Sequence, residues 1–166
     1  MTSPAPILAY PDPLFARRAE PRPVDAAMRD IGAALLATAR HHKAYGLTAA
    51  HIGAIEPLVV VSVGPLDKRD YRLLFNPEIV AFTADIASGP EGSVSMPGIE
   101  VDIPRSTSID LVFDDAGGTR QAMTLEGFPA RVAQHEIDQM NGIFFLDRLS
   151  RLKRDAALRR FRKLSR

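Results

Sequence analysis

The sequence contains no cysteine among its 166 residues. This absence excludes disulfide bonds, a thiolate nucleophile and every metal site built on thiolate ligands. No stretch approaches the roughly 18 apolar residues that a membrane-spanning helix needs. The residues from Met1 to Pro6 also lack the basic segment and apolar run of a secretory signal. The sequence therefore predicts a cytoplasmic protein with no membrane partner.

The chain also has little net charge, because 21 Lys and Arg residues face 20 Asp and Glu residues and leave a net charge of +1. A domain with this balance has no overall electrostatic reason to bind DNA or a membrane surface. At 166 residues and without an internal repeat, the chain fits one domain that can bury a core without disulfide or metal cross-links. We expect a single domain over residues 1–166.

The most informative stretch is Arg131–Gln139, which places His135, Glu136 and Gln139 at helical spacing. Residues i and i+4 lie on one face of a helix, so His-Glu-x-x-His presents two imidazoles to one zinc ion and a glutamate to the metal-bound water. Here Gln139 occupies the position of the second histidine, and a neutral amide binds zinc poorly. Alone, the pattern fits a damaged metal helix or a buried histidine satisfied by hydrogen bonds.

Two further stretches precede this helix, Gly46–His51 and Glu91–Pro97. In this order the three stretches resemble the peptide deformylase family, which carries Gly-φ-Gly-φ-Ala-Ala-x-Gln, Glu-Gly-Cys-Leu-Ser and Gln-His-Glu-x-Asp-His, where φ is apolar. The resemblance extends over nearly the whole chain and implies the peptide deformylase fold. It also implies that Ser93 replaces a ligand cysteine and Gln139 a ligand histidine, which leaves His135 as the only strong inherited ligand.

In that family a metal-bound water attacks the formyl carbonyl of a nascent N-formylmethionine. The resemblance implies that Glu136 is a vestigial general acid and base and that the Val94 backbone N–H is an oxyanion donor. His51 stands where the family has a glutamine that binds the formyl oxygen. The positions that the resemblance places near the substrate peptide are Gly46, Leu47 and Arg105, although an exposed arginine paired with a local aspartate would also explain Arg105.

Three functions remain open. The first is a binding-type pseudoenzyme that has lost the metal site, needs no cofactor and recognises the N-terminal peptide of a nascent chain. The second is a hydrolase with a rebuilt zinc or iron site, in which His51 and His135 supply imidazoles and Glu91 or Glu136 adds a carboxylate. The third is a metal-free hydrolase that uses Ser93 as its nucleophile.

A metal-free site should satisfy its buried polar groups internally. A buried imidazole without a partner would cost about 1 to 3 kcal/mol. We therefore expect the Ser93 hydroxyl, the Gln139 amide and the His135 ring to form a connected hydrogen-bonded network.

The hydrophobic pattern predicts an α+β fold, with antiparallel β-sheets around a buried helix, an N-terminal helix and a basic C-terminal helix. Residues 1–23 hold six of the thirteen prolines and should form an irregular arm. A helix is expected from the N-cap Asp25 to about Ala44, and the buried helix from Phe128–Pro129 to Asn141–Gly142. Strands are expected at 58–63, 72–75, 78–84, 108–113 and 120–125, with turns at 64–65, 76–77, 88–90 and 114–118.

Residues 149–166 predict a basic amphipathic helix, because Asp155 is the only acidic residue after Arg148. Its apolar stripe consists of Leu149, Leu152, Leu158, Phe161 and Leu164. Its basic face is either solvated or, as the resemblance implies, a contact with ribosomal RNA.

Overall fold

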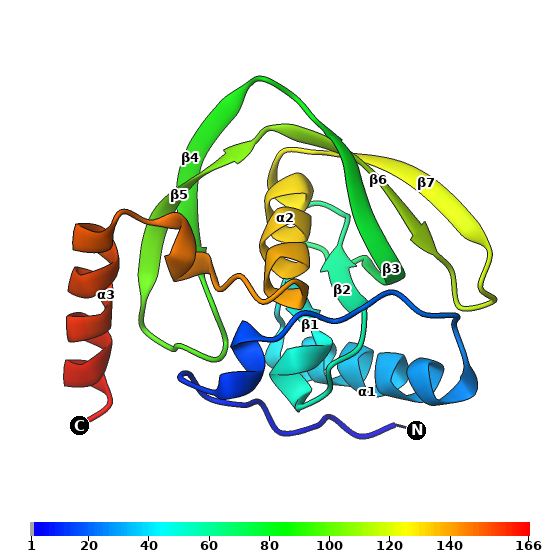
Figure 1. Cartoon of the computed structure of the whole chain (residues 1–166), viewed down its shortest axis with the longest axis horizontal. Helices are drawn as coiled ribbons and strands as arrows, with labels where there is room; N and C mark the ends of the chain where they lie inside the picture. The colour runs from blue at the N-terminus through cyan, green and yellow to red at the C-terminus, as the bar shows by residue number, and fades with distance from the viewer. Residues whose placement is uncertain (1) are drawn as a thin grey trace.

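Helix α2 (Phe128–Met140) runs through the middle of the fold, and the strands curve around it (Figure 1). The computed structural model describes residues 2–166. Nine of the thirteen α2 residues are buried, so the helix needs neighbours on nearly all sides. Pro129 lies in its first turn and Asn141 at its C-cap, which confirms the predicted bounds.

The main sheet has five antiparallel strands in the order β1-β2-β3-β6-β7. These strands are β1 (Gly46–Thr48), β2 (Leu58–Ser62), β3 (Tyr71–Phe82), β6 (Ser108–Asp114) and β7 (Arg120–Glu126). Every residue of β2 is buried, because α2 and α1 (Ala26–His42) both contact this strand. Strand β1 lies at one end of the sheet, so one of its edges pairs with no strand formed by residues 2–166.

A second sheet consists of β4 (Ile86–Gly92) and β5 (Glu100–Ser106), which form a ribbon beside α2 (Figure 1). The sequence pattern missed both strands and predicted a turn at 88–90, which is wrong. Pro90 is compatible with a strand here because a two-stranded ribbon has a free edge that needs no N–H from it.

The turn predicted at 76–77 is also wrong, because β3 continues through it. Asn76 adopts a positive φ of 47°, and the pairing register with β6 shifts between Phe75 and Glu78. The Asn76 amide holds this bulge by donating to the Arg22 carbonyl (2.7 Å) and to Asp114 Oδ2 (2.8 Å). The sequence correctly marked an irregularity, but it is a bulge within one long strand.

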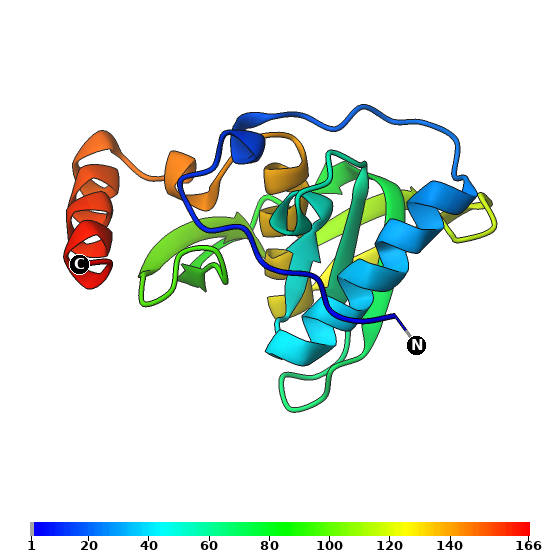
Figure 2. The ribbon, with the colours of Figure 1, turned by 90° about the horizontal axis from the view of Figure 1, so that it is seen from below.

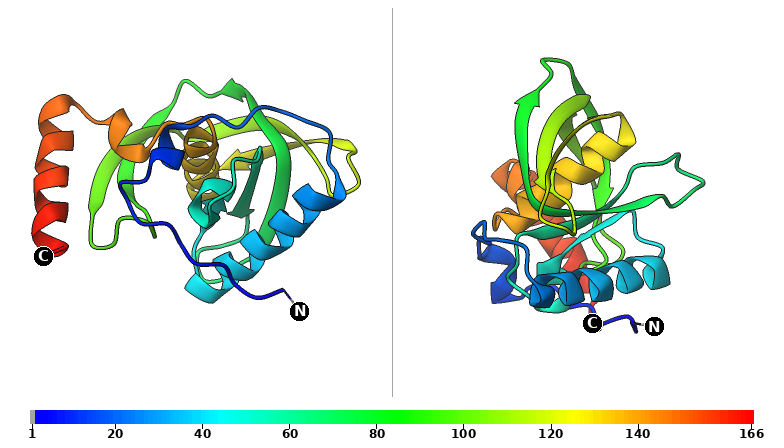
Figure 3. Two further views of the ribbon diagram at one scale, coloured as in Figure 1. Left: turned by 60° about the horizontal axis from the view of Figure 1, so that its bottom comes forward. Right: turned by 90° about the vertical axis from the view of Figure 1, so that its right-hand side faces the viewer.

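The N-terminal arm is irregular apart from a short 3-10 helix, η1 (Pro13–Ala16). It crosses the face that carries β1 and a second 3-10 helix, η2 (Ala49–Ile52) (Figure 3). Leu8 N–H donates to the His51 carbonyl, and Tyr10 N–H donates to the Ser95 carbonyl, both at 2.8 Å. The arm is therefore hydrogen-bonded to both segments that precede the helix in the family resemblance, Gly46–His51 and Glu91–Pro97.

Helix α3 (Arg151–Leu164) follows the 3-10 helix η3 (Phe145–Arg148) and stands beside the β4–β5 ribbon, apart from the main sheet (Figure 2). Ala157, Leu158 and Phe161 pack into the core cluster there. The predicted stripe is wrong at two positions, because Leu152 is 77% and Leu164 56% exposed. The short contact with a two-stranded ribbon covers only part of the helix. Within residues 2–166, no helix combines the length and apolarity needed to cross a bilayer.

Candidate functional site

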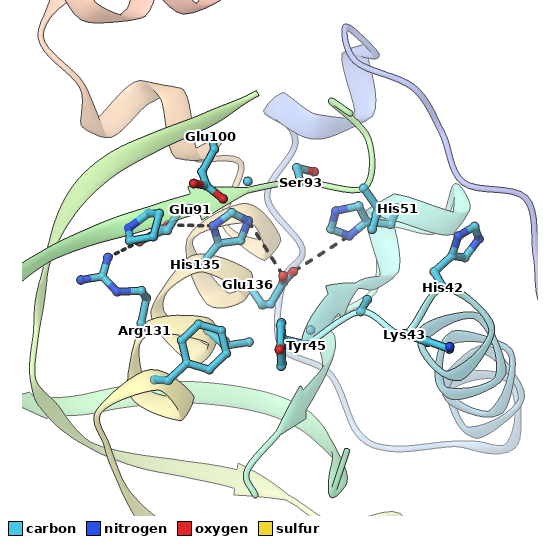
Figure 4. A pocket seen from close by; sticks show the side chains of 17 residues that line it. His42, Lys43, Tyr45, His51, Glu91, Ser93, Glu100, Arg131, His135 and Glu136 are labelled. Carbon is cyan, nitrogen blue, oxygen red and sulfur yellow. Dashed lines mark hydrogen bonds and ion pairs between the residues drawn. The ribbon is translucent and has the colours of Figure 1, made fainter. Parts of the chain in front are cut away.

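A cavity of about 470 Å³ lies between α2, β1 and the residues that end β4 (Figure 4). Helix α2 presents one face to it, at positions i, i+3, i+4, i+7 and i+8. Those five residues are Phe128, Arg131, Val132, His135 and Glu136. The opposite walls include Tyr45, Gly46, His51, Ser93 and Val94.

Gly46 allows β1 to lie directly against α2. A Cβ atom at this position would stand 2.6 Å from Val132 Cγ1 and 2.8 Å from Glu136 Cγ. Both distances are shorter than any real carbon contact, so a side chain would push β1 off the helix. The glycine thereby sets where Glu136 meets the cavity wall.

His135 is bound by a carboxylate. Its Nδ1 lies 2.8 Å from Glu91 Oε1, and the Glu91 carboxylate also accepts from Arg105 Nε and Nη2 (both 2.9 Å) and from Arg131 Nη1 (2.8 Å). The side chains of Glu91 and Arg105 are 4% and 5% exposed. Glu91 is thus the centre of a buried cluster that fixes the orientation of the His135 ring.

The same contacts shift two pKa values. Burial would raise the pKa of Glu91, but the hydrogen bonds from Arg105 and His135 outweigh burial and lower the pKa from 4.5 to about 2. For His135, burial would lower the pKa, but the hydrogen bond with Glu91 and the charge of Glu136 raise it above its ordinary value of 6.5. The pair is therefore held in its charged form.

Arg105 does not lie where the resemblance places it, near a substrate peptide. It is buried, does not line the cavity, and donates to Asp138 Oδ2 (2.5 Å) as well as to Glu91. The alternative of an exposed arginine with an aspartate partner is right about the partner and wrong about the exposure. Leu47 is also buried and packs in the core cluster shared with α1, so of the three predicted substrate residues only Gly46 lines the cavity.

Glu136 faces both histidines without a hydrogen bond to either. Its Oε1 lies 3.9 Å from His135 Nε2, and its Oε2 lies 4.0 Å from His51 Nδ1 (Figure 4). Glu136 Oε2 is buried and has no hydrogen-bond partner among residues 2–166. Burial raises the pKa of Glu136 from 4.5 to about 7, against the opposing charge of His135.

His51 lines the cavity, but its Nδ1 is already in use. The Thr48 N–H donates to His51 Nδ1 at 3.0 Å, and this is the nitrogen that faces Glu136. Burial lowers the pKa of His51 from 6.5 to about 3, and the charge of His135 lowers it further. His51 Nδ1 is also 3.2 Å from the Thr48 carbonyl, so in either tautomer this nitrogen is engaged by the Thr48 backbone and does not join His135 as a metal ligand.

The predicted network of Ser93, Gln139 and His135 is wrong. Ser93 Oγ accepts from the Ser95 N–H at 3.1 Å, and His135 Nδ1 is taken by the Glu91 carboxylate. Both polar atoms of the Gln139 side chain are buried and without a partner in the described part of the chain. A carboxylate forms a stronger hydrogen bond with imidazole than a hydroxyl or an amide does. Glu91 belongs to the Glu91–Pro97 segment that carries the family resemblance. The sequence therefore contained a signal that Glu91 takes part in the site.

The donors at the three inherited ligand positions do not fit a zinc or iron ion. They are an imidazole, a hydroxyl already engaged by a backbone N–H, and a neutral amide. Across residues 2–166, no three His, Asp or Glu side chains come together in an arrangement that could hold a metal ion. A pocket of this kind can still bind a ligand through hydrogen bonds and apolar contact.

A histidine and a glutamate side by side on one buried helix that faces a cavity are also found in helix-based metal hydrolases. A family model described as polypeptide deformylase matches residues 4–155. The chain belongs to the peptide deformylase family.

Two relatives come from Rhizobium meliloti (strain 1021). One, named peptide deformylase-like, is 40% identical over 162 residues, covering 97% of this chain and 93% of its own length. The other, named peptide deformylase, is 34% identical over 160 residues, covering 95% and 92%. Among solved structures, peptide deformylase from Ehrlichia chaffeensis in complex with actinonin has a TM-score of 0.88 at 30% identity, with 99% of each chain covered.

Proposed function

We propose that this protein binds the formylated N-terminus of a peptide without hydrolysing it, as a pseudoenzyme of the deformylase family. The donor set carries the proposal. Ser93 and Gln139 stand at two ligand positions, and neither contacts His135 through a hydrogen bond. One imidazole alone does not retain zinc or iron at the free concentrations found in cells.

Three features of the cavity support binding. Its volume of about 470 Å³ is within the range of small-ligand sites. The Val94 N–H has no acceptor within residues 2–166 and can donate to a carbonyl oxygen. The free edge of β1 at Gly46 can pair with an extended peptide. A peptide would therefore be held by its backbone and its acyl oxygen.

The names of two relatives support a binding role beside a separate deformylase. Rhizobium meliloti carries both a protein named peptide deformylase and one named peptide deformylase-like. A cell with a conventional deformylase does not need hydrolysis from the second copy. In the cytoplasm, where nascent chains are available, the second copy can act by binding alone.

Calorimetric titration with formyl-Met-Ala-Ser and with the same peptide lacking formyl tests this proposal. We expect the formylated peptide to bind more tightly, because only its acyl oxygen can accept from the Val94 N–H. Mass spectrometry after prolonged incubation should find the peptide intact. Release of formate that scales with protein concentration and disappears in Glu136→Ala would contradict the proposal.

We also propose that the exposed basic face of α3 contacts ribosomal RNA. Arg159, Arg162 and Lys163 are exposed and form no ion pair with an acidic side chain in residues 2–166. We expect their joint replacement by glutamate to weaken cosedimentation with ribosomes and to flatten its dependence on salt, because fewer counterions are released.

The matched control reverses the charge of three exposed cations elsewhere in the chain, Arg17, Arg40 and Lys68. Both variants have the same net charge. If the two variants lose ribosome association equally, or neither does, the α3 face is a solvated surface.

A further inference from the structure

The face of α2 that lines the cavity has a C-terminal end and an N-terminal end. His135 and Glu136 form the first, and Phe128 lies two turns before them. A ligand whose acyl group sits at Glu136 and Val94 would extend its first side chain along α2. One helical turn is about 5.4 Å, so a side chain of four heavy atoms reaches Arg131 and Val132.

Arg131 makes this part of the wall polar. Its guanidinium lies flat on β4, and a Cβ atom at Gly89 would stand 3.2 Å from Arg131 Cζ. Because Gly89 has no side chain, the Arg131 guanidinium can lie against β4 at this position. The neighbouring walls are apolar and aromatic, with the Tyr45 and Phe128 rings packed edge to face at 4.7 Å.

Arg131 does not use all of its hydrogen-bond donors within the protein. Nη1 donates to Glu91 Oε2 (2.8 Å) and to the Ile103 (2.6 Å) and Gly89 (3.3 Å) carbonyls, and Nη2 donates to the Ala87 carbonyl (2.7 Å). A guanidinium has five N–H groups. The Nε–H and one N–H of Nη2 find no acceptor in residues 2–166, and both nitrogens remain accessible, so they are free to donate to a ligand in the cavity that Arg131 lines.

We propose that Arg131 makes the cavity prefer a ligand whose first side chain ends in an amide or carboxylate oxygen, such as glutamine or glutamate, over methionine. This inference rests on the proposed binding of formylated peptides. A thioether is a weak acceptor, so a methionine side chain would cover unpaired N–H groups of a charged donor without satisfying them. Glutamine and glutamate have nearly the same length and carry an acceptor at the required place.

The test compares formyl-Gln-Ala-Ser, formyl-Glu-Ala-Ser and formyl-Met-Ala-Ser by calorimetry on the unmodified protein. We expect at least one of the first two to bind about tenfold more tightly than the methionine peptide, the effect of one hydrogen bond from a charged donor. In Arg131→Met, which removes the donors and keeps an unbranched side chain, the methionine peptide should bind at least as tightly as the others. A thermal melt confirms that the variant is folded.

The outcomes separate this inference from the proposed function. If all three peptides bind the unmodified protein equally, or methionine binds best, the selectivity is wrong and the binding function stands. If the preference survives in folded Arg131→Met, another residue is responsible and the assignment to Arg131 fails. If no formylated peptide binds, the proposed function fails, and the selectivity fails with it. The measurement on the unmodified protein decides the preference even where the variant does not fold.

Discussion

Replacing Glu91 with alanine is expected to lower the free energy of unfolding by about 3 to 5 kcal/mol. The substitution removes the only acid that pairs with Arg131 and one of two that pair with Arg105 in residues 2–166. Arg105 is 5% exposed and cannot regain water for its guanidinium without opening the fold. The loss is therefore the cost of a buried charge left without its partner, and urea unfolding followed by circular dichroism measures it.

Asp102→Ala provides the control, because Asp102 is an exposed acid on β5 of the same ribbon. Its free energy of unfolding should change by no more than about 0.5 kcal/mol. A loss below about 1 kcal/mol in Glu91→Ala would show that water enters the cluster, and the description of a buried ion network would be wrong.

The Glu91 cluster also predicts how stability depends on pH. The pKa of Glu91 is about 2 in the folded protein against an ordinary value of 4.5. A lowered pKa means that the unfolded chain binds the proton more readily, so the contribution of Glu91 is complete above pH 4.5 and is lost as the pH falls toward 2. Glu91→Gln should lack this part of the acid dependence. Parallel stability curves for the two proteins between these pH values would contradict the assignment.

Restoring the inherited ligands should produce the largest functional change. In the double variant Ser93→Cys with Gln139→His, a thiolate and a second imidazole join His135, and we expect about one equivalent of metal per chain. Glu91 already accepts from His135 Nδ1 at 2.8 Å, which leaves Nε2 free and oriented, as in carboxylate-histidine-metal sites. Elemental analysis after growth with added zinc or iron measures the gain.

Each single variant is a control, because two strong ligands hold a metal less firmly than three. We expect either one alone to bind well under one equivalent. A folded double variant that binds no metal would mean that the cavity has lost the geometry of the site as well as its ligands.

The sequence predicted the fold correctly where its hydrophobic periodicity is strong. Helix α2 and the buried strand β2 were predicted within a residue or two, because apolar spacing determines which face is buried. Strands β4 and β5 were missed, since a ribbon with a free edge tolerates Gly89, Pro90 and Pro104. Side-chain pattern alone does not distinguish such a ribbon from a loop.

The sequence motifs indicated residues that come together in the structure, but not the contacts that these residues make. The motifs identified Ser93, His135 and Glu136, and all three line one cavity. The hydrogen bonds depend on tertiary placement: Glu91 and His135 are 44 residues apart in the chain and 2.8 Å apart in space. Arg131 went unnoticed because an arginine on a helix is usually solvated, and only the space at Gly89 lets it lie against β4.

The metal content of the unmodified protein tests the central claim most directly. Protein purified without added metal or chelator should contain well under one equivalent of zinc, iron or nickel by elemental analysis, and the same sample should leave formyl-Met-Ala intact. This result follows from an imidazole, a hydroxyl and an amide at the ligand positions. Stoichiometric metal that is lost in His51→Ala, together with release of formate, would contradict the claim and establish a rebuilt metal site.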